Sequence, residues 1–127
     1  MNHTATPTAI VFDSRAKTVG PFSPGVSIGS LLQVAGQVGV APTALDALAP
    51  APAASVRAPT LRTLDNVREF FAEGRTRWED VLMFCVYLTD TSDFEKFNDT
   101  YREYFSAQGC ETLPARTTVY VGRQGCW

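Results

Sequence analysis

The 127-residue sequence predicts a single α+β domain, residues 1–127, in which two helices cover one face of a mixed sheet. Three patterns favour this class: short apolar runs suited to strands, two segments with helical apolar spacing, and alternation of the two types in the second half. Strand–helix–strand crossovers are right-handed, so both helices are expected on the same face. The opposite face would be bare, and another subunit is its ordinary cover.

The N-terminal third is expected to supply the first strands. Residues 1–9 are expected to be a flexible tail, and residues 10–12 a short strand. The next segment, residues 19–25, contains two glycines and two prolines, which is typical of a loop. The sequence therefore predicts a sheet that starts at residue 10 and resumes after residue 25.

Residues 27–40 have the composition of two strand-like halves. Gly36 and Gly39 interrupt this segment, and a glycine within a strand often marks a bulge or a close backbone approach. Residues 41–54 are rich in alanine and proline and are predicted to be a loop. No second core is expected on either side of that loop.

Two helices are predicted from periodicity. The first runs from Ser55 to Glu73, with Gly74 available as a left-handed C-terminal residue. The second opens at Ser92 or Asp93 and carries a heavy aromatic stripe that is expected to pack in the core. The apolar residues at helical spacing are Leu61, Leu64, Val67 and Phe71 in the first helix, and Phe94, Phe97, Tyr101, Tyr104 and Phe105 in the second.

The two remaining strands lie after the first and second helix. Residues 81–88 are apolar on both faces and suit a covered central strand, with Cys85 as a small buried hydrophobe. Pro114 marks the start of the last strand, because proline cannot donate to a ladder. Arg116 stands at the beginning of that strand, where a rigid backbone would let its planar fork grip a carboxylate through two hydrogen bonds.

Composition excludes several classes of function. A net charge of −2 offers no electrostatic footprint for nucleic acid, and no apolar run approaches the roughly 18–20 residues of a spanning helix. The three cysteines lack metal-ligand spacing and are expected to be reduced thiols in a cytoplasmic protein. His3, the only histidine, lies in the expected tail, which argues against a Ser/His/Asp or Cys/His triad.

Several short motifs, taken together and in this order, resemble the RidA (YjgF) family of small imine deaminases. They are Gly20-Pro21-Phe22-Ser23, Ala35-Gly36-Gln37, residues 60–67, residues 80–90, Phe97-Asn98 with Tyr101, and Pro114-Ala115-Arg116-Thr117-Thr118-Val119. The resemblance covers about residues 12–121, nearly the whole chain.

The resemblance implies a homotrimer of chorismate-mutase-like subunits with sites in the clefts between neighbours. Family members hydrolyse 2-imino and 2-enamino acids to 2-keto acids and ammonia and use no cofactor or metal. Arg116 would hold the substrate carboxylate, and backbone groups at Thr118 would lie beside the imine and the attacking water. Phe22, Ala35 and Gly36 would line the substrate pocket.

The sequence departs from the family pattern at three places. Phe22 replaces a tyrosine and Ala35 replaces a frequent serine, so the pocket is expected to be more apolar. After Gly122, a final family strand that carries a glutamate for the attacking water does not appear. Two alternatives to the deaminase therefore stay open: a non-catalytic relative that binds a small carboxylate metabolite or a partner protein, and a repurposed enzyme of specialised metabolism.

Overall fold

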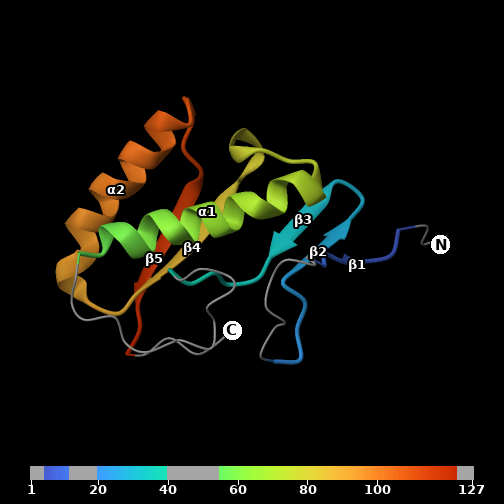
Figure 1. Cartoon of the computed structure of the whole chain (residues 1–127), viewed down its shortest axis with the longest axis horizontal. Helices are drawn as coiled ribbons and strands as arrows, with labels where there is room; N and C mark the ends of the chain where they lie inside the picture. Colours follow the sequence, from blue (N-terminus) through green and yellow to red (C-terminus); the bar gives the residue numbers. More distant parts are fainter. Residues whose placement is uncertain (1–4, 12–19, 40–54, 123–127) are drawn as a thin grey trace.

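Two helices pack over strands in a computed structural model that describes residues 5–11, 20–39 and 55–122 (Figure 1). This arrangement confirms the predicted α+β class and the predicted order of strands and helices. The elements are β1 (Thr8–Ala9), β2 (Gly25–Ile28), β3 (Leu31–Val34), α1 (Arg57–Gly74), a 3₁₀ turn (Trp78–Asp80), β4 (Met83–Leu88), a second 3₁₀ turn (Thr91–Asp93), α2 (Phe94–Ala107) and β5 (Ala115–Tyr120).

The first three strands form an antiparallel sheet in the order β1-β2-β3. The first strand lies earlier than predicted: Thr8 and Ala9 pair with β2, so part of the expected tail belongs to the sheet. Strands β2 and β3 form a hairpin that turns at Gly29, whose φ of 56° suits glycine. Gly36 and Gly39 follow β3 and do not interrupt a strand, but the predicted close backbone approach is confirmed at Gly39, where a Cβ would lie 2.6 Å from Cα of Pro59.

Strands β4 and β5 form a separate parallel pair in which Phe84 faces Arg116. Within the described residues no backbone hydrogen bonds join β3 to β4. The structure therefore has two separate sheets, β1-β2-β3 and β4-β5, where the sequence predicted one. The expectation about the residues that follow Gly122 falls on residues 123–127, outside the described ranges. The predicted loop at residues 41–54 and residue 12 of the predicted first strand also lie outside them.

Helix α1 connects the two strand units. Its left-handed C-terminal residue is Arg75, with φ 53°, and not Gly74 as predicted. Gly74 serves a different purpose: a Cβ there would overlap the terminal methyl group of Leu32 in β3, so glycine lets the helix end approach the sheet without displacing that side chain. Nearer the middle of α1, buried Asn66 donates from Nδ2 to the Val38 carbonyl at 3.0 Å. The segment after β3 is thereby held against the helix.

Helix α2 begins at Phe94, one or two residues later than predicted. The preceding turn is closed by Asp90, whose Oδ1 accepts from the Ser92 backbone N–H at 2.8 Å and from its hydroxyl at 2.7 Å. The side-chain carboxylate of an aspartate accepts from the backbone two residues later, as a backbone carbonyl does in a turn, and this stabilises the turn before the helix. The capping side chain of this turn is Asp90, whereas Asp93, the residue directly before α2, makes no capping hydrogen bond.

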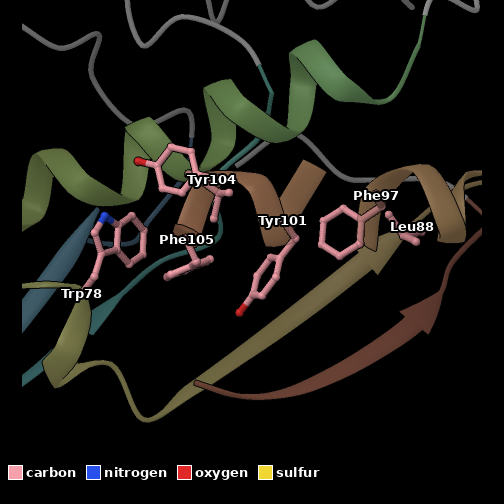
Figure 2. Close-up of a cluster of buried hydrophobic side chains, with 7 residues drawn as sticks. Trp78, Leu88, Phe97, Tyr101, Tyr104 and Phe105 are labelled. Atoms are coloured by element: carbon pink, nitrogen blue, oxygen red, sulfur yellow. The ribbon is translucent and has the colours of Figure 1, made fainter. Parts of the chain in front are cut away.

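The core lies between α1, α2 and β4 (Figure 2). The predicted aromatic stripe of α2 is confirmed as core packing for all but Phe94, which is 37% exposed. Its central ring, Phe105, is fully buried and lies edge-on to Trp78 at 4.9 Å. The buried members are Leu64, Trp78, Leu88, Phe97, Tyr101, Tyr104 and Phe105.

The other face of β4 is uncovered in the single chain. Side chains of β4 alternate, so that Met83, Cys85 and Tyr87 are exposed while Leu88 is buried. The prediction of a strand covered on both faces is therefore wrong for one chain, and so is the prediction that Cys85 is buried. The bare face itself was expected from the placement of both helices on one side.

Candidate anion site at Arg116

Arg116 is the second residue of β5 and faces α2. It pairs with Phe84 in the parallel ladder, and paired residues of adjacent strands point to the same side of a sheet. That side is the one covered by α2 (Figure 1). Arg116 therefore lies on a paired strand, as predicted, and its side chain is half-buried.

The guanidinium of Arg116 is held by three residues of one helical turn. Its Nη2 donates to Asn98 Oδ1 at 2.6 Å. Its Cζ lies 5.2 Å from the ring centroid of Phe97 and 5.0 Å from that of Tyr101. These distances are in the range of cation–π contacts, so a neutral amide and two aromatic faces surround the charge.

No carboxylate of the described residues pairs with Arg116, whereas other arginines do have such partners. Arg57 pairs with Glu103 across the helices, and Arg102 pairs with Asp99 on the outer face of α2. A half-buried cation without a counter-ion is costly, and its remaining N–H donors can bind an anion. A planar guanidinium matches a carboxylate best, through parallel hydrogen bonds.

Thr118 presents its backbone beside this cation. The backbone N–H groups of Ala115 and Val121 donate to β4, at 3.0 Å to Leu82 and 2.9 Å to Leu88. Because backbone direction alternates along a strand, the N–H and C=O of Thr118 point to the other edge of β5. No described strand covers that edge, so these groups are available next to the side of the sheet that carries Arg116.

The remaining predicted site residues lie elsewhere in the chain. The Ala35 N–H donates to the carbonyl of Pro24, two residues after Phe22, at 2.9 Å, and exposed Gly36 follows Ala35. Phe22 precedes β2 of the β1–β3 sheet, whereas the segment after β3 runs along α1 towards β4 (Figure 1), with Val38 bonded to Asn66 and Gly39 against Pro59 near the start of the helix. Within the described residues, the hydrogen bond and ring contacts of Arg116 all come from α2.

Two neighbouring ionisable groups have raised pKa values. Burial raises the pKa of the Tyr101 hydroxyl, and the nearby Arg116 charge partly opposes this rise. Burial and the Glu79 carboxylate raise the pKa of the Cys110 thiol, which disfavours a reactive thiolate there.

Across the described ranges, no group of three or more His, Cys, Asp or Glu side chains is arranged to hold a metal ion. In the same ranges, no helix is long and apolar enough to cross a membrane.

Sequence reasoning missed the role of Asn98. From the sequence, Asn98 enters only as part of the Phe97-Asn98 motif and is given no contact with Arg116. The available signal was its place directly after Phe97 and three residues before Tyr101, which puts the three side chains on neighbouring positions of one helix turn. These three side chains meet Arg116 only because of the way α2 crosses β5, and the spacing of residues in the sequence does not define that crossing.

Comparison with known proteins identifies the family. Residues 12–124 match the family described as endoribonuclease L-PSP. The chain belongs to this family. A RutC family protein of Saccharolobus solfataricus is 36% identical over 115 residues, which cover 90% of this chain and 85% of that protein. An Escherichia coli K12 family member named 2-iminobutanoate/2-iminopropanoate deaminase is 29% identical over 114 residues, or 90% and 84% of the two chains.

Solved structures of the family share the fold. The E. coli YjgF gene product has a TM-score of 0.77 and 29% sequence identity, with 92% of this chain and 87% of that chain covered. E. coli TdcF, solved with bound serine, also has a TM-score of 0.77, at 27% identity and the same coverages. The RidA (YjgF) resemblance and its α+β fold, both expected from the sequence motifs, are confirmed.

Proposed function

We propose that this protein hydrolyses small 2-imino and 2-enamino acids to 2-keto acids and ammonia, with Arg116 as the anchor of the substrate carboxylate. The observation that carries the proposal is a half-buried guanidinium held by an amide and two rings, without a carboxylate partner among the described residues. The names of relatives at about 30% identity support the choice of substrate class.

The chemistry requires orientation more than a strong catalyst. With the carboxylate fixed on Arg116, the imine carbon next to it is held in one place relative to the free edge of β5. Thr118 backbone groups there orient a water molecule. The water oxygen bonds to the imine carbon, the C=N π electrons move to nitrogen, and a water proton follows. The hydroxyl proton of the resulting carbinolamine then moves to nitrogen, the C–N bond breaks with its electron pair going to the departing ammonia, and the keto group forms.

The complete site is placed between subunits of a homotrimer. The hydrogen bond and ring contacts of Arg116 come from α2 alone, and in the proposed trimer a neighbouring copy would bring Phe22, Ala35 and Gly36 to it. The exposed apolar face of β4 and β5 supports association, because Met83 is 49% exposed and Val119 is 38% exposed. The pocket built in this way takes a small carboxylate and presents an apolar wall.

A non-catalytic carboxylate-binding protein is the second candidate. Phe22 has no hydroxyl to offer, and no described carboxylate or imidazole contacts Arg116 to act as a general base. Binding would then be retained without turnover. The ribonuclease activity in the description of the family is not extended to this chain, whose net charge is −2 and whose sole histidine is His3.

Turnover of 2-iminobutanoate tests the proposal. An amino-acid oxidase generates the imine in situ, semicarbazide traps it, and the semicarbazone is measured with wild type, Arg116→Ala and Arg116→Lys. We expect wild type to suppress trapping, Arg116→Ala to match buffer, and Arg116→Lys to be intermediate because lysine keeps the charge without the fork. Arg102→Ala, which removes a paired surface arginine, is the matched control and should behave as wild type.

The same proteins separate the two candidates. If wild type does not suppress trapping but binds 2-oxobutanoate in an Arg116-dependent way, the protein is a carboxylate binder. If it neither turns over the imine nor binds 2-oxobutanoate, the assignment of Arg116 as an anchor is wrong.

A further inference from the structure

We infer that Phe97 and Tyr101, here called the aromatic platform, set the plane of the Arg116 guanidinium for its ligand, and that Tyr101 is a positioning residue. This inference deepens the proposed function, on which it rests for the identity of the ligand. The mechanism described above needs an arginine at the start of β5 but does not explain what orients its flexible side chain.

The platform contacts the cation from two directions. The ring centroids of Phe97 and Tyr101 are 5.8 Å apart with an interplanar angle of 41°, and Cζ of Arg116 is about equally far from both, at 5.2 and 5.0 Å. Asn98 then holds Nη2 from a third side at 2.6 Å. Three contacts from one helix turn limit both the position and the rotation of the planar group. Ordering before the ligand arrives reduces the entropy lost on binding.

The rings themselves are held by the core. Tyr101 is 4% exposed and contacts Phe84 at 6.1 Å and Phe105 at 4.7 Å, so its ring has little freedom to move. Figure 2 shows it extending from α2 towards the side of the fold that contains β4 and β5. Its hydroxyl has no hydrogen-bond partner among the described residues. The ring, and not the hydroxyl, is therefore the part that acts on Arg116.

Tyr104 provides a matched comparison on the same helix. It is 7% exposed, close to the value for Tyr101, but its hydroxyl donates to Asp65 at 3.0 Å and its ring lies against Trp78. It makes no cation–π contact with Arg116. Loss of either ring disturbs the core, and loss of Tyr104 also removes the hydrogen bond to Asp65, so a loss of affinity that is specific to Tyr101 reports on positioning.

Binding of 2-oxobutanoate tests the platform. The dissociation constant is measured by calorimetry for wild type, Tyr101→Phe, Tyr101→Leu, Phe97→Leu and Tyr104→Leu, with melting temperatures recorded in parallel. A cation–π contact that is partly shielded from water corresponds to roughly a fivefold to thirtyfold change in affinity. We expect a loss of that size for Tyr101→Leu and Phe97→Leu. Tyr101→Phe should stay within about twofold of wild type, since it keeps the ring.

The control decides between positioning and general loosening. Tyr104→Leu should lower the melting temperature at least as much as Tyr101→Leu, because it also loses the hydrogen bond to Asp65, while leaving the dissociation constant within about twofold of wild type. Equal weakening in the two leucine variants would overturn the inference. So would a loss in Tyr101→Phe as large as that in Tyr101→Leu, because the hydroxyl would then be the active group. Phe97→Leu supplies the same comparison if Tyr101→Leu does not fold.

A second measurement does not depend on the ligand. The Nε–Hε signal of Arg116 is identified by NMR as the one missing from Arg116→Ala. The ring currents of two nearby aromatic faces should displace it from the ordinary arginine position. The displacement should shrink in Tyr101→Leu and persist in Tyr101→Phe and Tyr104→Leu. An unchanged signal in Tyr101→Leu would overturn the platform, whereas failure of wild type to bind 2-oxobutanoate would overturn only the proposed function.

Discussion

At the scale of single residues, the contact between Asn98 and Arg116 defines which donors remain for a ligand. Arginine carries only N–H donors, so the amide oxygen of Asn98 must be the atom that faces Nη2. The amide nitrogen then points away from the guanidinium. Because the asparagine side chain is neutral, it orients the guanidinium and leaves its positive charge available to a negatively charged ligand.

Replacement of this amide by a carboxylate should convert the site into an internal ion pair. In Asn98→Asp the two partners keep their places, and we expect a gain in stability of about 0.5–1 kcal/mol from the half-buried pair. The affinity for 2-oxobutanoate should fall at least about tenfold, because the new carboxylate competes for the same guanidinium. Urea unfolding and calorimetric titration measure the two effects.

Asn98→Ala serves as the control for this substitution. It removes the hydrogen bond without adding a charge, so it should lose a little stability and weaken 2-oxobutanoate binding less than Asn98→Asp does. If Asn98→Asp binds 2-oxobutanoate as tightly as wild type, Arg116 is not the carboxylate site.

At the scale of elements, α2 links three parts of the fold. One side of the helix holds Arg116 of β5, and another is joined to α1 through the hydrogen bond from Tyr104 to Asp65 at 3.0 Å. Burial, reinforced by the Asp65 carboxylate, raises the pKa of Tyr104 from 10.0 to about 12. The link between the helices is therefore a protonated phenol throughout the neutral range.

This raised pKa predicts a pH dependence of stability. The folded state holds the Tyr104 proton more tightly than the unfolded state, whose pKa is near the ordinary 10.0. The contribution is fully present below pH 10 and is lost as the pH rises towards 12. In urea unfolding between pH 8 and 12, wild type should lose more free energy of unfolding than Tyr104→Phe, which has no phenol to ionise there. Parallel curves for the two proteins would contradict the assignment.

How far sequence predicts these elements depends on the range of the interactions. The aromatic stripe of α2 was found because helix periodicity is local, and the start of the Arg116 strand because Pro114 marks it. The turn at Gly29 and the left-handed Arg75 were missed, since nearby glycines offered equally good alternatives. The contacts of Arg116 and the exposure of Cys85 depend on how distant elements cross, and no local pattern encodes that crossing.

At the scale of the whole molecule, the two halves of the proposed site are on different parts of the chain. Arg116 and Thr118 lie on β5, while Phe22 and Ala35 lie with the β1–β3 sheet. The side of β4 and β5 opposite the helices is apolar and exposed in a single chain. One assembly of several copies would cover this face and could bring the two halves together.

A charge on the bare face should therefore disrupt both assembly and site. Val119 lies in β5 on the exposed side, next to Tyr87 of β4 in the ladder. In Val119→Lys, burial of an unpaired ammonium against a second copy is costly, so we expect the proposed trimer to dissociate towards monomers in light scattering. Ala107→Lys, at the exposed end of α2, adds the same charge away from this face and should leave the mass unchanged.

The loss of assembly should be accompanied by a loss of turnover, although Arg116 and its aromatic platform stay intact on the other side of β5. In the NMR measurement, the Arg116 signal of Val119→Lys should keep its wild-type position, because the platform belongs to the same chain. Imine hydrolysis should fall to the background rate, because Phe22 and Ala35 of a neighbour are no longer present. A monomeric Val119→Lys protein with full turnover would show that one chain holds the complete site, and the intersubunit arrangement would be wrong.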